Sequence, residues 1–370
     1  SGGFSVLNLF AGGGLGLLYE SSVIGTLYQT TAMQSPPSAG GAVALTLDRS
    51  QSSGAIVPVF GAQKSDSGAD ATEWYASRTS EVITQSGSRT RATAQSSTAF
   101  GPAIVLTGLE VGKTYLAEAA CFASASFGVF AYRVSTSLDQ NGSVVSTPAG
   151  PDNRLTFIAP ATTVYVGIIA TSDASGDWVE IGEASVKEVL GNHARQTTGT
   201  LQSKYQTGPA RKLYDGIDDH DTTTLKPTVA GTLAVRMRSD TASRFAIGSQ
   251  PASNGRCYIG LASDGSLAGG IGTQATSVIK GSADVRTDWV TGILTWDGST
   301  VTLYQDGVSV YSGAQSGAVN TTIDFYIGAI NNNGASAAVH DGDIARDLVL
   351  NRAITAKEAT DLSSLWSTIL

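Results

Sequence analysis

The sequence has few cysteines and few charges. Its two cysteines, Cys121 and Cys257, cannot build a disulfide framework or a cysteine metal site, so we expect two buried thiols. Charged residues make up 15% of the chain, well below the ~25% of an ordinary soluble domain. With little charge and 43 glycines, the composition favours short strands joined by tight turns over long helices.

Basic runs and long uninterrupted apolar stretches are also missing. The net charge of −8 would repel a phosphate backbone, which excludes nucleic acid as a partner. Residues 4–19 are mostly apolar, but glycines interrupt them and no basic region precedes them. A membrane-spanning helix needs about 20 apolar residues, so we expect no membrane insertion and an extended segment that packs against protein.

Sequence motifs for catalysis are absent as well. The three histidines, His193, His220 and His340, belong neither to an H-E-x-x-H helix nor to a G-x-S-x-G turn. A glycosidase needs two carboxylates that face each other across its substrate. Glu180 and Glu183 have odd spacing on an expected strand and should therefore point to opposite faces. We predict that the protein is not an enzyme.

Strand patterns dominate residues 71–190. The stretch "TTVYVGII" (162–169) alternates with the period of a half-buried strand. The stretch "DWVEIGEASVKEV" (177–189) indicates a closing strand, with Val179 and Ile181 pointing inward. Turn residues recur every ~8–12 residues, which is typical of an all-β sandwich.

Residues 191–370 combine a strand meander with one helix. The stretch "GILTWDGSTVTLYQDGVSVYSG" (292–313) indicates three strands separated by two Asp-Gly turns. The stretch "ITAKEATDLSSLW" (354–366) is helical, with Thr355 and Glu358 in the positions of a capping box. The predicted fold class is all-β: two β-sandwiches after an extended N-terminal segment, with one short C-terminal helix.

Several longer stretches resemble known sandwich families. Four occur in order in the last domain: "LYDGIDDHDTT" (213–223), "WDGSTVTLYQDGVSVYSG" (296–313), "FYIGAINNN" (325–333) and "DGDIARDLVLNRAITAKEATDL" (341–362). In this order they resemble the concanavalin-like laminin-G sandwiches. Three stretches of the middle domain, "LTGLEVGKTY" (106–115), "LTFIAPATTVYVGI" (155–168) and "DWVEIGEASVKEV" (177–189), resemble the galactose-binding-like jelly rolls of carbohydrate-binding modules. Two lectin-like sandwiches are what these resemblances imply.

The opening of the chain adds a second kind of resemblance. The stretches "NLFAGGGLGLLYESSVIGTLYQTT" (8–31) and "GGAVALTLDRS" (40–50) are similar to the opening of bacteriophage and gene-transfer-agent appendage proteins. In such proteins a motif like "LDRS" is followed directly by one like "GNHARQTT". In this chain the first motif is at residues 47–50 and the second begins at residues 191–194, so the two are far apart in the sequence. We therefore expect the jelly roll to be an insertion between the opening segment and the laminin-G-like domain.

The acidic stretch "KLYDGIDDH" (212–220) allows two interpretations. Carboxylates are the ligands that a hard cation prefers, so Asp218 and Asp219 are candidate calcium ligands. The alternative is structural: Asp215 and Gly216 form a turn, and Asp218 and Asp219 bond backbone amides at a strand start. An EF-hand pattern is absent. We favour the structural interpretation, with no cofactor.

Carbohydrate binding would require exposed aromatic rings beside polar groups. Trp296 and Trp366 are expected in the core, whereas Trp178 and Trp289 follow aspartates and are candidates for exposure. The predicted glycan contacts are Trp178 and Asp177 in the jelly roll, and Asn331, Asn332 and Asn333 at a loop tip of the laminin-G-like domain.

The resemblances imply a virion appendage, such as a head fibre, tail fibre or spike of a phage-like particle, that binds host-surface glycans. Residues 1–48 would anchor it to other virion proteins, through Phe4, Leu7, Leu9 and Phe10, because a free monomer would expose this apolar stretch. A linker (49–70), the jelly roll (71–190) and the laminin-G-like domain (191–370) would follow, in a homo-oligomer on the particle exterior. The alternatives are a decoration protein without ligand, a polysaccharide depolymerase and a secreted adhesin.

Overall fold

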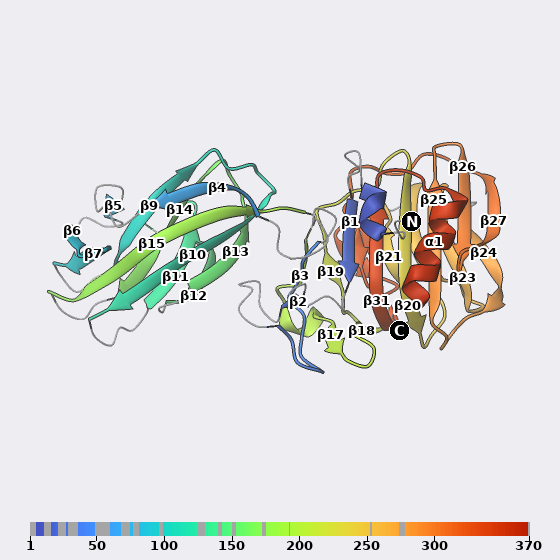
Figure 1. The fold of residues 1–370 in the computed structure, drawn as a ribbon, viewed down its shortest axis with the longest axis horizontal. Coiled ribbons are helices and arrows are strands. Elements are labelled where there is room, and N and C mark those ends of the chain that lie inside the picture. The colour runs from blue at the N-terminus through green and yellow to red at the C-terminus, as the bar shows by residue number, and fades with distance from the viewer. Residues whose placement is uncertain are drawn as a thin grey trace. The chain divides into compact units, whose positions relative to one another are not determined.

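The protein consists of two compact, nearly all-β units. The computed structural model describes residues 5–10, 16–20, 27–28, 36–48, 60–67, 75–76, 81–95, 99–124, 130–139, 143–149, 153–171, 175–191, 193–251, 254–273 and 278–368. Unit 1 comprises Ser1–Thr30, Ser35–Val59 and Gly191–Leu370, and unit 2 comprises Thr31–Gln34 and Phe60–Leu190. Figure 1 labels their elements. The prediction of two β-sandwiches with one short C-terminal helix is confirmed.

Two sheets build unit 1. The first, called the helix-side sheet below, has the order β17 (Lys204–Gln206), β18 (Arg211–Asp215), β31 (Asp341–Leu350), β20 (Gly231–Ser239), β25 (Val290–Trp296), β26 (Thr300–Gln305) and β27 (Val308–Ala314), and β1 (Gly16–Glu20) also pairs with β31. The second has the order β2 (Leu27–Tyr28), β3 (Leu45–Thr46), β16 (Ala194–Arg195), β19 (Asp221–Thr222), β28 (Tyr326–Ile327), β21 (Phe245–Ser249), β22 (Asn254–Leu261), β23 (Ser266–Thr273) and β24 (Val278–Asp284), with β29 (Ile330–Asn332) and β30 (Ala335–Ala337) added beside β21. A 3-10 helix, η3 (Gly199–Leu201), precedes β17.

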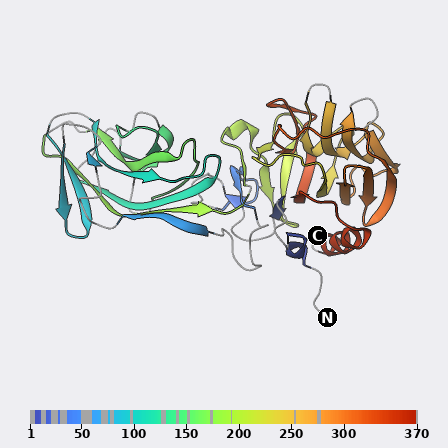
Figure 2. The same ribbon diagram turned by 90° about the horizontal axis from the view of Figure 1, so that it is seen from above.

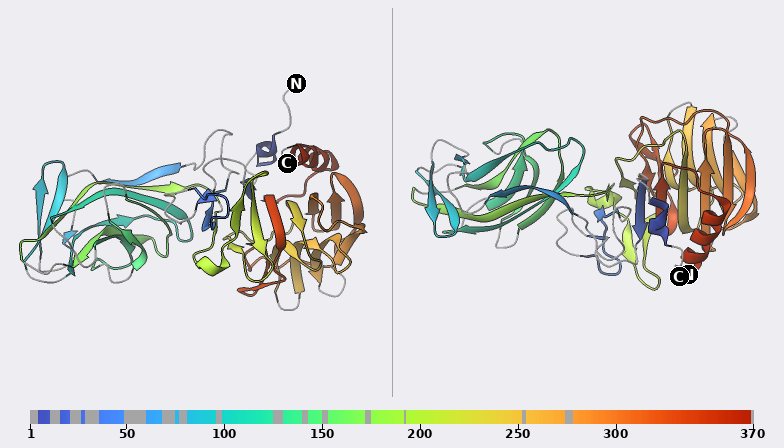
Figure 3. Two further views of the ribbon diagram at one scale, coloured as in Figure 1. Left: turned by 90° about the horizontal axis from the view of Figure 1, so that it is seen from below. Right: turned by 45° about the horizontal axis from the view of Figure 1, so that its top comes forward.

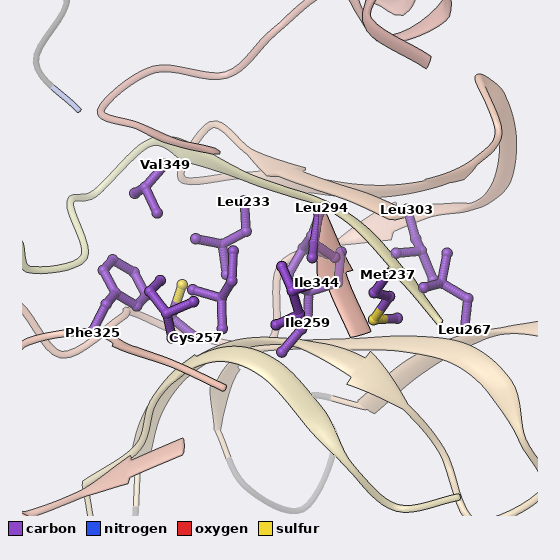
Figure 4. Close-up of a cluster of buried hydrophobic side chains, with 14 of the residues drawn as sticks. Leu233, Met237, Cys257, Ile259, Leu267, Leu294, Leu303, Phe325, Ile344 and Val349 are labelled. Atoms are coloured by element: carbon purple, nitrogen blue, oxygen red, sulfur yellow. The ribbon is translucent and has the colours of Figure 1, made fainter. Parts of the chain in front are cut away.

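The core of unit 1 lies between these two sheets. Leu233, Val235 and Met237 of β20 alternate inward, as the two-residue period of a strand requires. They meet side chains from the other sheet, including Cys257 and Ile259 of β22. Figure 4 shows Leu233 and Met237 with Cys257 and Ile259 in one layer between the strands. Cys257 and Cys121 are both buried, as predicted, and burial raises the pKa of each thiol.

The outer face of the helix-side sheet is covered by two helical segments. Helix α1 (Ala356–Ser367) begins after Thr355, and both hydrogen bonds of the predicted capping box with Glu358 are present. Its buried stripe packs on the sheet together with the 3-10 helix η1 (Val6–Phe10). Figures 2 and 3 both show η1 and α1 on the same side of unit 1. Among the described residues, no helix combines the length and hydropathy of a membrane span.

The start of the chain belongs to the apolar cluster under α1, and this corrects our reason for expecting an anchor. Leu9 and Phe10 are 1% and 8% exposed, and the half-buried Leu7 packs against the same cluster. Strand β1 pairs with β31, with Leu18 opposite Leu348. Leu9 and Phe10 are thus covered by their own chain and are not available to a particle protein. Phe4 lies outside the described residues.

Unit 2 is inserted into unit 1, as the separation of the motifs at 47–50 and 191–194 predicts. Strands β3 and β16 pair on either side of the insertion, with Leu45 opposite Arg195. The backbone N–H of Asp48 donates to Nδ1 of His193 at 3.0 Å. Gly191 has φ +119°, and a Cβ there would lie 2.9 Å from the Asp48 side chain, so only glycine fits.

Unit 2 also consists of two sheets. One has the order β13 (Asn153–Ile158), β10 (Thr114–Ala123), β15 (Trp178–Val189), β7 (Arg89–Ala94) and β6 (Glu81–Ser86), with β4 (Phe60–Ser67) also paired to β15. The other has the order β12 (Ser143–Pro148), β11 (Phe130–Ser135), β14 (Thr163–Thr171), β9 (Pro102–Thr107) and β5 (Tyr75–Ala76), with β8 (Ala99–Phe100) on β14. The predicted inward positions Val179 and Ile181 lie in its core, and so do Val164 and Val166 of the alternating stretch 162–169. Strand β4 lies within residues 49–70, so this part of the predicted linker is instead a paired strand of unit 2.

Candidate functional site

The acidic stretch after β18 forms a turn held by its own carboxylates. Oδ1 of Asp215 accepts from the backbone N–H groups of Ile217 (2.9 Å) and Asp218 (3.3 Å). Oδ2 of Asp219 accepts from the backbone N–H of Asp215 at 3.1 Å. Gly216 has the positive φ (+74°) that the turn requires. Asp215 therefore makes the backbone bonds that we predicted for Asp218, while Asp219 has its predicted role.

The same turn brings three carboxylates together. Ligand atoms of Asp215, Asp218 and Asp219 lie within 4.8 Å of one another. Burial raises the pKa of Asp219 to about 7, and the negative charge of Asp215 adds to this effect. Oxygen ligands of this kind suit calcium, so the calcium interpretation stays a prediction beside the structural one.

Two substitutions separate these interpretations. Asp219→Ala leaves the Asp215 amide without its partner and should cost about 1–3 kcal/mol of the free energy of unfolding. Asp218→Ala removes no backbone bond of the described residues and should cost less than about 0.5 kcal/mol. Thermal melts with and without millimolar calcium check both. A melting temperature of the wild type that rises with calcium, and no longer does so in Asp218→Ala, would establish a cation site.

The three asparagines do not form one polar loop tip. Asn331 is 5% exposed, its Nδ2 donates to the carbonyl of Asp324 (2.8 Å), and its Oδ1 accepts from the N–H of Gly334 (2.7 Å). It closes the β29–β30 hairpin, a structural role in place of the predicted glycan contact. Asn332 and Asn333 are exposed, and Asn333 (φ +53°) forms the turn itself.

Trp178 lies at the start of β15, and an arginine covers its ring. Cζ of Arg91 lies 4.2 Å from the ring centroid, and the same guanidinium donates to Oε1 of Glu180 through Nε (2.9 Å) and Nη2 (2.6 Å). Burial alone would raise the pKa of Glu180, but hydrogen bonds from Ser86, Arg91 and Arg89 outweigh it and hold this pKa below its usual range. Glu180 therefore stabilises the sheet as a carboxylate. Asp177 is half-buried beside it, whereas the Glu183 side chain lies outside the described residues.

On the outer face of the helix-side sheet, three rows of side chains run across the strands. The row under α1 is apolar: Leu18, Leu348, Ala234, Ile293 and Tyr304. The next row is Glu20, Arg346, Arg236 and Thr291, and the third contains Asp343 and Arg238 with Trp289 beside them. All four side chains of the second row are buried, and so is Asp343. Arg238 and Trp289 of the third row are partly exposed, so they are the groups that a ligand can reach.

We call Arg236, Arg238, Arg346 and Trp289 the arginine–tryptophan surface. The half-buried Trp289 ring has two guanidinium groups near it: Cζ of Arg238 lies 5.8 Å and Cζ of Arg236 lies 6.0 Å from its centroid. Arg238 donates to Oδ2 of Asp343 at 2.5 Å, and 36% of its side chain is exposed. Arg236 and Arg346 are buried, so Arg238 is the exposed cation of this surface. A flat ring beside it offers a stacking face next to fixed hydrogen-bond donors.

The sequence contained a signal for this surface that we did not use. Arg236 and Arg238 are two residues apart in "RMRSD" (236–240), so on a strand they share one face. Trp289 follows a turn and precedes the neighbouring strand β25. Arg346 comes from β31, about a hundred residues later, and its position opposite Arg236 appears only once the sheet order is known.

Comparisons with known proteins place this surface in a concanavalin-like domain. Residues 214–360 match the family model of the concanavalin A-like lectin/glucanases superfamily. No curated protein matches the chain.

Solved structures are similar only over part of the chain. A CBM40 of the Ruminococcus gnavus IT-sialidase bound to α2,3-sialyllactose has 14% identity and a TM-score of 0.32, over 37% of this chain and 83% of that one. Domain 4 of AbnA, a GH43 extracellular arabinanase from Geobacillus stearothermophilus in complex with arabinotriose, has 16% identity and a TM-score of 0.35, over 44% and 81%. The binding domain of botulinum neurotoxin serotype G has 9% identity and a TM-score of 0.35, over 48% and 49%. At these scores the likenesses carry no argument about function.

Proposed function

We propose that the protein is a non-catalytic glycan-binding protein whose main site is the arginine–tryptophan surface of unit 1. One observation carries this proposal: a half-buried tryptophan lies in the segment that matches the concanavalin A-like lectin/glucanases superfamily, with two guanidinium groups about 6 Å from its ring centroid. Sugar rings stack on such aromatic faces while polar groups fix their orientation. With one half-buried ring and one partly exposed arginine, the site would bind a single sugar weakly, and several copies would raise the avidity by ~10²–10⁴.

Unit 2 supports the proposal less directly. The guanidinium of Arg91 lies over one face of Trp178, so a sugar would have to use the other face or displace a side chain that already bonds Glu180. We keep Trp178 and Asp177 as a second candidate site. The exclusion of catalysis remains part of the proposal, because Glu180 is held as a carboxylate by Arg89 and Arg91.

Truncation of each tryptophan tests the choice of site. Trp289→Ala in the full chain should weaken binding to the best ligand of a glycan array by about tenfold or more, since loss of an aromatic anchor costs about 2 kcal/mol. Trp178→Ala should change this affinity by less than about threefold. Tyr311→Ala, at a 37% exposed aromatic on β27, controls for general surface effects. If Trp178→Ala has the larger effect, the site belongs to unit 2.

We further propose that these lectin-like units are presented on the exterior of a phage-like particle, as a homo-oligomeric appendage held by other virion proteins. The support is the similarity of residues 8–31 and 40–50 to the opening of phage and gene-transfer-agent appendage proteins. Any contact with the particle would use a surface other than the buried Leu9 and Phe10. Detection of the chain in purified particles, by mass spectrometry, is the test. Its absence there, together with glycan binding in solution, would favour a secreted adhesin.

A further inference from the structure

We infer that the ligand of the arginine–tryptophan surface is an acidic sugar, recognised through its carboxylate by Arg236 and Arg238 while its ring stacks on Trp289. This inference rests on the proposed glycan-binding function and names its ligand class. The support comes from the arginines, because a neutral sugar would need no such concentration of cations.

The first observation is the arrangement of like charges. Arg236 and Arg346 lie directly opposite each other on β20 and β31, and they are 7% and 3% exposed. Like charges in this position are destabilising. Burial lowers the pKa of Arg236; the charge of Asp306 opposes this effect, and the charge of Arg346 adds to it. Arg236 pairs with Asp306 (3.3 Å) and Arg346 pairs with Glu20 (3.0 Å), and a bound anion would add to this compensation.

The second observation is that the local carboxylates do not use up the donors. Nη1 of Arg236 donates to the carbonyl of Trp289 (3.2 Å), to Oγ1 of Thr291 (3.2 Å) and to Oδ1 of Asp306 (3.3 Å). Nε of Arg236 and Nε of Arg238 also lack a partner among the described residues, but both atoms are buried and out of reach of a ligand. The donors that remain for a further acceptor are Nη2 of Arg236 and Nη1 of Arg238, neither of which makes a bond among the described residues.

The third observation is the sharing of one carboxylate by two arginines. Arg211 pairs with Oδ1 of Asp343 and Arg238 pairs with Oδ2 of the same side chain. A carboxylate matches the planar fork of a guanidinium and can accept two bonds from it. A sugar acid combines this group with a ring that stacks on an aromatic face.

A matched pair of ligands tests the inference. We would measure binding of the full chain to a galacturonic acid oligosaccharide and to its carboxyl-reduced form, which keeps the rings and loses the charge. We expect at least tenfold tighter binding of the acid. This preference should shrink as NaCl is raised from 50 to 500 mM, because salt screens exposed charges.

Substitutions then assign the preference to residues. Arg238→Gln should weaken binding of the acid about tenfold or more and leave the reduced sugar within twofold. Arg238→Lys should give an intermediate loss, since it keeps the charge without the fork. Arg154→Gln in unit 2 is the matched control, because Arg154 also pairs with a carboxylate across a strand and is 38% exposed.

The outcomes are distinguishable. Equal affinity for the two sugars, or an equal loss of both in Arg238→Gln, would overturn the acidic-sugar inference, while a loss in Trp289→Ala would still support the proposed site. The comparison of the two sugars needs no variant, so it decides the inference even if Arg238→Gln fails to fold. Binding of neither sugar, combined with no effect of Trp289→Ala on any glycan, would overturn both.

Discussion

Removal of residues 1–20 should unfold unit 1. Four fully buried side chains are lost with this segment: Leu9, Leu17, Leu18 and Tyr19. Each contributes about 1.5–3 kcal/mol, so the loss is roughly 6–12 kcal/mol, comparable with the whole stability of a domain, about 5–15 kcal/mol. The deletion would also leave one edge of β31 unpaired over Arg346 to Leu350. A particle anchor, by contrast, could be removed without harm to the fold.

The experiment has a matched deletion. The truncated chain and a chain without residues 60–190 would be compared by circular dichroism and limited proteolysis. The second deletion should leave unit 1 folded, because Leu45 and Arg195 on either side of the insertion already pair. A truncated chain with a native melting transition of unit 1 would contradict the expected result and restore the anchor hypothesis.

Asp347→Asn should stabilise unit 1 at pH 8 and have little effect at pH 5. Asp347 is 1% exposed, and its Oδ1 has no hydrogen-bond partner among the described residues. Burial raises its pKa to about 7; Lys212 opposes this effect, and Asp221 and Asp48 add to it. Lys212 already pairs with Asp221 at 2.6 Å, so loss of the Asp347 charge does not leave this cation alone.

The sign of the pH dependence follows from the raised pKa. Between about pH 4 and pH 7 the folded protein binds a proton at Asp347 that the unfolded chain has released, so stability falls as the pH rises through this range. At pH 8 the wild type holds a buried carboxylate and the variant does not, a difference on the order of 2 kcal/mol.

Calorimetry of the full chain at both pH values measures this difference in the transition of unit 1. Asp361→Asn on α1, which removes a charge paired with the exposed Lys357, is the control. If the difference in the free energy of unfolding between Asp347→Asn and the wild type is the same at pH 5 and pH 8, ionisation of Asp347 costs no stability and the expectation is wrong.

Local patterns in the sequence predicted local structure well. The capping box at Thr355 and the Asp306-Gly307 turn depend on neighbouring residues alone, and both occur as expected. The alternation in residues 162–169 likewise identified the inward face of β14. These features hold because backbone conformation and strand period act over a few residues.

The errors concern contacts between distant segments. An apolar stretch indicates that something will cover it, but not whether the cover is another protein or its own chain; Leu9 and Phe10 are covered by α1 and the helix-side sheet. The tripeptide of asparagines was polar enough to suggest a binding loop. The fold instead uses Asn331 to close a hairpin. The arginine–tryptophan surface depends on the order of strands in a sheet, which no short motif records.

The pairing of β1 with β31 also governs when unit 1 can be completed during synthesis. Glu20 and Arg346, which form a buried ion pair, are 326 residues apart. At ~5–20 residues per second, β1 would wait roughly 15–65 s on the ribosome before its partner strand is made. Unit 2 is made entirely within that interval. The apolar opening segment stays without its native cover throughout, so newly made chains should depend on chaperones until the last strand emerges.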